Sequence, residues 1–112
     1  MQIQITTDHN IEGHQPLLDQ VRATVSEAVG SFSAHITRVE VHLSDENSDK
    51  KTGVNAFRCV MEAKLAGQKP AVVTDDATSL DQSIAGAAEK LARLIVSIRG
   101  RERAKQKAES GG

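Results

Sequence analysis

Histidine, cysteine and aspartate side chains are the groups in this chain that could bind a metal ion or attack a substrate. The four histidines are scattered, and none stands at HxH or HxxxH spacing or is paired with the cysteine. A structural zinc site needs four convergent ligands and a catalytic zinc site at least three, so we expect surface histidines and no metal site. They are His9, His14, His35 and His42.

The single cysteine, Cys59, could act as a nucleophile only with a base beside it and a lowered pKa. It alternates with Phe57 and Met61 on the apolar side of a predicted strand. We therefore expect Cys59 to be a buried, small hydrophobic residue rather than a reactive thiol.

Three aspartates, Asp75, Asp76 and Asp81, could form an acid pair or a site for a divalent cation. Neither EF-hand spacing nor a glycine-rich phosphate loop accompanies them. Carboxylates are favoured at a helix N-terminus, so we expect all three to mark the start of a helix. We thus expect no catalytic residues and no cofactor. A small hydrolase is the alternative, and it would need histidine and aspartate side chains converging in a concave pocket.

Charge is unevenly distributed along the chain, whose formal net charge is −1. Residues 1–49 hold two basic residues against eight acidic ones, whereas residues 89–110 hold seven basic against three acidic. The basic stretch could contact nucleic-acid phosphates, but it could equally be a solvated helix end, because charged outer faces are common. The acidic first half could meet a protein partner.

The basic residues of the second half fall on two sides of a predicted helix at 100° per residue. Lys90, Arg93 and Arg101 form one stripe beside the apolar face, and Arg99 and Arg103 lie on another side. Because the stripe lies off the apolar face, reversing its charges is expected to leave the melting temperature nearly unchanged.

Six elements must position these residues. A capping box starts the second helix at Thr78-x-x-Asp81, or one register later at Ser79-x-x-Gln82. Gly86 is expected to pack closely against the sheet, and the core contact of this helix should end near Arg99. Periodicity predicts strands at residues 2–6, 36–44, 57–65 and 70–74, a helix from Gln15 to about residue 30–33 with Pro16 in its first turn, and a polar hairpin loop at residues 45–53.

This order of elements predicts an α+β fold, β-α-β-β-β-α. The first crossover is long enough for parallel pairing, and hairpins join the next three strands. We expect a four-stranded sheet with two helices on one face and a polar second face. Residues 1–99 are predicted to form a single domain, and residues 100–112 a basic, flexible extension.

Composition narrows the function further. With two Phe and no Trp or Tyr, base stacking on aromatic side chains is nearly excluded, so RNA contact would use phosphates. No basic-then-apolar leader opens the sequence, so we expect a cytoplasmic protein. No apolar run approaches the roughly 20 residues of a membrane span, so no membrane partner is expected.

Several segments together resemble one family. They are the opening strand MQIQIT, Asn10-Ile11-Glu12, apolar Val21 and Phe32 in the first helix, the Val-x-Val-x-Leu strand at 39–43, and Ile84 followed by Lys90-Leu91-Ala92-Arg93 and a basic end. In this order and spacing, they are similar to the ribosome hibernation-promoting factors, also known as ribosome-associated inhibitor proteins, in their short form.

The resemblance implies a fold similar to double-stranded RNA-binding domains and a non-enzymatic role in stress. Such a protein would dock in the decoding channel of the small ribosomal subunit and keep idle ribosomes silent. The ribosomal RNA contacts carried over by position are Arg22 in the first helix and Lys90, Arg93, Arg99, Arg101 and Arg103 in the second.

The sequence departs from the family pattern in its first helix, where Thr24 and Glu27 stand at positions that commonly hold lysine. The alternative hypothesis is a diverged protein-interaction or stress-response regulatory module of the same fold that does not bind the ribosome.

Overall fold

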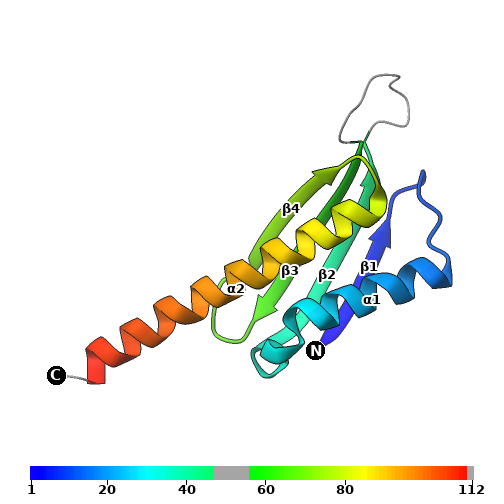
Figure 1. Ribbon diagram of the computed structural model, residues 1–112. Helices are drawn as coiled ribbons and strands as arrows, with labels where there is room; N and C mark the ends of the chain where they lie inside the picture. Colours follow the sequence, from blue (N-terminus) through cyan, green and yellow to red (C-terminus); the bar gives the residue numbers. More distant parts are fainter. Residues whose placement is uncertain (47–55, 111–112) are drawn as a thin grey trace.

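The computed structural model describes residues 1–46 and 56–110, with side chains described as far as residue 104. Within these residues the elements follow the predicted order, with one short 3-10 helix added (Figure 1). The α+β fold, β-α-β-β-β-α, is therefore confirmed. Its elements are β1 (Gln2–Thr7), α1 (Gln15–Val29), η1 (Gly30–His35), β2 (Ile36–Asp45), β3 (Phe57–Leu65), β4 (Ala71–Ala77) and α2 (Leu80–Ser110).

The four strands form one mixed sheet in the order β1-β2-β3-β4. β1 pairs with β2 in parallel, as predicted for a crossover that contains α1, and the other two pairs are antiparallel. Both helices cover the same face of the sheet (Figure 1). β1 and β4 are left as the two edge strands.

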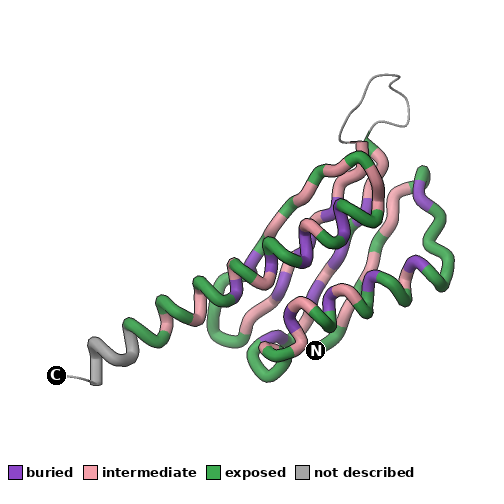
Figure 2. Tube along the Cα trace, in the orientation of Figure 1, coloured by how far each residue is buried: buried purple, intermediate pink, exposed green. Residues whose placement is uncertain are grey.

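The core lies between the sheet and the two helices, where the buried positions in Figure 2 are concentrated. Alternate residues of β2 and β3 point into it, and every third or fourth residue of each helix meets them. Full burial of one such aliphatic side chain contributes about 1.5–3 kcal/mol. The residues with at most 1% exposure include Val21, Val25, Val29, Val39, Val41, Leu43, Cys59, Met61, Ile84, Leu91 and Ile95.

Side chains cap the N-terminus of each helix. The Nδ1 atom of His14 accepts the Leu17 N–H at 3.2 Å, and Pro16 sits in the first turn of α1, as predicted. At α2 the hydroxyl of Ser79 accepts the Gln82 N–H at 3.1 Å. The later of the two predicted capping registers, Ser79-x-x-Gln82, is the one that forms.

The expected role of Asp75 and Asp76 at a helix start is wrong, because β4 continues through both residues to Ala77. Their side chains point to opposite faces of the sheet. Asp75 lies under α2, and Asp76 lies on the outer face. Only Asp81 occupies the first turn of α2.

Two of the predictions concern where β2 and α2 end. Asp45, the first residue of the predicted hairpin loop, belongs to β2, and residues 47–53 lie outside the described residues. α2 is helical as far as Ser110 and projects beyond the sheet (Figure 1). The domain boundary at residues 99 and 100 stays a prediction.

Candidate nucleic-acid interface

The basic residues of α2 lie on two flanks of the helix, on either side of the face that packs on the sheet. One flank runs along the edge strand β4 and includes Lys90 and, further on, Arg101 beside Lys69 and Pro70. The other faces η1 and includes Arg99 and Arg103.

Lys90 is bound to β4. Its Nζ donates to the Thr74 carbonyl oxygen at 2.9 Å and lies 2.9 Å from an Asp75 carboxylate oxygen. The same carboxylate fills the space above Gly86, where an added Cβ would overlap it. The predicted close approach at Gly86 is thus confirmed, and the ammonium group of Lys90, although its side chain is 44% exposed, is already bonded to β4.

Arg22 makes a similar contact at the opposite edge of the sheet, where its guanidinium donates to the Ile3 carbonyl oxygen at 3.1 Å. Edge strands carry main-chain groups that no neighbouring strand satisfies. Arg22 and Lys90 each bond one edge strand, β1 and β4 respectively. An RNA phosphate would have to compete with these contacts for both side chains.

Arg93 is 69% exposed and lies 3.5 Å from Glu89, which is 71% exposed. Such an exposed i,i+4 pair contributes about 0.3–0.5 kcal/mol and exchanges readily with solvent. Arg93 is therefore accessible to a phosphate.

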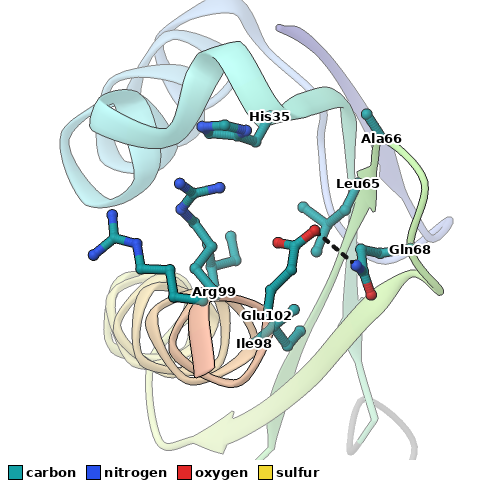
Figure 3. A pocket seen from close by; sticks show the side chains of 9 residues that line it. His35, Leu65, Ala66, Gln68, Ile98, Arg99 and Glu102 are labelled. Carbon is teal, nitrogen blue, oxygen red and sulfur yellow. Dashed lines mark hydrogen bonds between the residues drawn. The ribbon is translucent and has the colours of Figure 1, made fainter. Parts of the chain in front are cut away.

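Arg99, Arg101 and Arg103 make no ion pair with any side chain that the structure describes. Arg101 and Arg103 are exposed, and Arg99 is half-buried. Arg99 and Arg103, one turn apart, line a pocket together with His35 from η1 and Gln68 from the turn between β3 and β4 (Figure 3). His35 and Gln68 were missed as partners because nothing in their sequence positions relates them to α2.

Replacing Lys90 with glutamate should destabilise the fold, which revises the expectation that reversing the charges of the stripe leaves stability unchanged. The new carboxylate would face Asp75 and leave the Thr74 carbonyl without its donor. We expect the free energy of unfolding to fall by about 1–2 kcal/mol in urea titrations. Arg93→Glu is the matched control, and a change above about 0.5 kcal/mol is not expected there. Equal stability of both variants would contradict the role given to Lys90.

The outer face of the sheet carries charges of both signs. Arg58 Nε lies 2.8 Å from Asp76, and its Nη1 lies 2.8 Å from Glu46. The hydrogen bond from Arg58 lowers the pKa of Asp76, and the hydrogen bond to Asp76 raises the pKa of Arg58. The described basic residues of this face thus have acidic neighbours, as the contacts Arg38–Glu40 and Lys64–Glu62 also show.

The other chemical candidates have structural roles. Cys59 is fully buried, as predicted, and burial, with a smaller effect from Asp75, raises the pKa of its thiol to about 12. Among residues 1–46 and 56–104, no three His, Cys, Asp or Glu side chains gather as a metal site would require. Within the described residues, neither helix has an apolar stretch of the length that a bilayer crossing needs.

Comparisons with known proteins agree with this fold. The model of a family described as sigma 54 modulation protein / S30EA ribosomal protein matches residues 3–103. The Protein Y N-terminal domain from Thermus thermophilus is 19% identical, with a TM-score of 0.68 over 85% of this chain and 96% of that one. A ribosomal subunit interface protein from Coxiella burnetii is 11% identical, with a TM-score of 0.72 over 89% and 99%. No curated protein matches the chain.

Proposed function

The chain belongs to the sigma 54 modulation protein / S30EA ribosomal protein family, and from this premise we propose that it is a ribosome-associated translation inhibitor, or hibernation factor. It would occupy the decoding channel of the small ribosomal subunit, where messenger and transfer RNA would otherwise lie. A protein that inhibits by occupying the decoding channel needs no catalytic residue and no cofactor. Because ribosomes are the partner, the protein would act in the cytoplasm.

One observation carries the RNA-binding part of the proposal. The part of α2 that projects beyond the sheet presents Arg101 and Arg103 as exposed side chains without an ion pair among the described residues, and Arg93 lies exposed before them. An arginine guanidinium can bind a phosphate through two parallel hydrogen bonds. We assign the main phosphate contacts to Arg93, Arg99, Arg101 and Arg103, and weaker ones to Arg22 and Lys90.

The salt dependence of binding tests the assignment. Four phosphate contacts release counterions on binding, so the logarithm of the affinity should fall with the logarithm of the salt concentration at a slope of about −3 to −4. The measurement is a titration of labelled chain with purified small subunits at several salt concentrations. A slope near zero would contradict binding through phosphates.

A protein partner is the second candidate, and the surface of α1 favours it. Glu27 and Asp19 are exposed there, and Arg22 is bonded to β1, so this helix offers little positive charge to RNA. If α1 binds a basic protein, a pull-down should yield one stoichiometric protein whose capture nuclease does not change. Loss of the captured protein after nuclease treatment would argue against this candidate.

A further inference from the structure

A pocket with a volume of about 230 Å³ lies where three segments meet beside the core (Figure 3). His35, the last residue of η1, forms one wall, the turn after β3 forms the second, and α2 forms the third. The Ala66 N–H donates to the His35 carbonyl oxygen at 3.1 Å, and the Gln68 side chain donates to Glu102 at 3.0 Å. These two hydrogen bonds connect the three walls to one another, so the pocket is held in place by contacts of the fold itself.

The floor of the pocket is apolar and its walls carry planar polar groups. Leu65, Ile95 and Ile98 supply the floor. The imidazole of His35, the guanidinium of Arg99 and the amide of Gln68 stand around it. A flat ring can rest on aliphatic side chains and stack on an imidazole or guanidinium plane, and both of these planes stack on bases in RNA-binding proteins.

Positive charge is concentrated on one side of the pocket. Arg99 and Arg103 are four residues apart on α2, about 6 Å along the helix axis, and Arg103 is the more exposed of the two. Neither forms an ion pair with a described side chain. Glu102 lies in the same wall, and its carboxylate accepts a hydrogen bond from Gln68. Two guanidinium groups without an ion pair, at the mouth of a small pocket with an apolar floor, suit a phosphate attached to a flat ring.

We propose that this pocket binds one nucleotide, with the base on the apolar floor between His35 and Arg99 and the phosphate at Arg99 and Arg103. The volume is below the roughly 300–1,000 Å³ of sites for drug-sized ligands, so it suits a single base and not a dinucleotide. The nucleotide is either a free nucleoside monophosphate or one unit of single-stranded RNA. The proposal goes beyond ribosome binding, because the chain would bind the nucleotide by itself. The isolated chain is therefore sufficient for the test.

Titration of the isolated chain with AMP, with a short oligoadenylate and with ribose 5-phosphate tests the proposal. NMR amide shifts should move at His35, Ala66 and Gln68. Saturation by AMP identifies a free nucleotide as the ligand, and saturation by the oligonucleotide alone identifies a nucleotide within RNA. Absence of shifts with both, shifts confined to other elements, or equal affinity for ribose 5-phosphate would overturn the proposal.

Variants separate the base from the phosphate. Arg99→Ala with Arg103→Ala should weaken binding at least about 10-fold by removing the phosphate contacts. Ala66→Leu adds bulk at an exposed lining residue without changing charge, and it should weaken binding about as much. Arg38→Ala with Lys64→Ala, which removes the same charge from neighbouring residues of β2 and β3 outside the pocket, is the control and should bind like the unmodified chain. Unchanged affinity in both pocket variants would place the ligand elsewhere.

Discussion

Replacing Arg101 and Arg103 with glutamate should lower the affinity of the chain for the small ribosomal subunit by about 100-fold or more. Each charge-assisted hydrogen bond contributes about 1.5–3 kcal/mol, and a carboxylate in its place repels the phosphate. Both residues are exposed and lie beyond the core contacts of α2, so the melting temperature should stay the same. Binding is measured by co-sedimentation, and folding by thermal denaturation monitored by circular dichroism.

The control for this double variant changes the net charge equally on the far side of the sheet. Arg38→Glu with Lys64→Glu alters two neighbouring residues of β2 and β3 whose side chains have acidic neighbours. Subunit binding should survive in this control even if its stability falls slightly. Equal loss in both variants would show that binding responds to net charge alone and not to the end of α2.

Cys59 should react with a disulfide reagent at least about 1,000-fold more slowly in the folded chain than in denaturant. The thiolate is the reacting form, and burial raises the pKa of Cys59 to about 12, which leaves very little thiolate near pH 8. The residue is also fully buried, so the reagent has no access without opening of the core. Rapid, complete labelling of the folded chain would contradict this account of the core.

The raised pKa of the Cys59 thiol also predicts how stability changes with pH. Above about pH 9 the thiol of the unfolded chain ionises while the folded chain keeps its proton, so the folded state binds more protons. Stability from this group is complete below that pH and falls as the pH rises toward 12, by up to about 1.4 kcal/mol per unit. Cys59→Ala should remove this dependence in urea titrations at each pH.

The strands could be predicted where side chains alternate, and prediction failed where a tertiary contact overrides propensity. β3 was predicted with its observed bounds because apolar and polar residues alternate along all of it. The second half of β4 was missed because aspartate is depleted in strands. Asp75 is accommodated there by Lys90 of α2 and Asp76 by Arg58 of β3, and both contacts appear only in the folded chain.

The candidate site shows a similar limit. A helical projection placed Lys90 correctly beside the apolar face, but it carries no information on the strand that lies next to that side of the helix. The contacts of Lys90 with Thr74 and of Arg22 with Ile3 join residues 16 and 19 positions apart. The pocket likewise unites His35, Gln68 and Arg99 from three segments. The sequence could indicate which basic residues belong to the candidate site, whereas the residues that they contact depend on how the elements pack.

Co-sedimentation with purified small ribosomal subunits at low salt, with and without messenger and transfer RNA, tests the central claim most directly. The proposed function predicts that the chain travels with the small subunit and is released when messenger and transfer RNA fill the decoding channel. Its absence from the subunit fraction at low salt, or binding that both RNAs leave undisturbed, would contradict occupation of that channel.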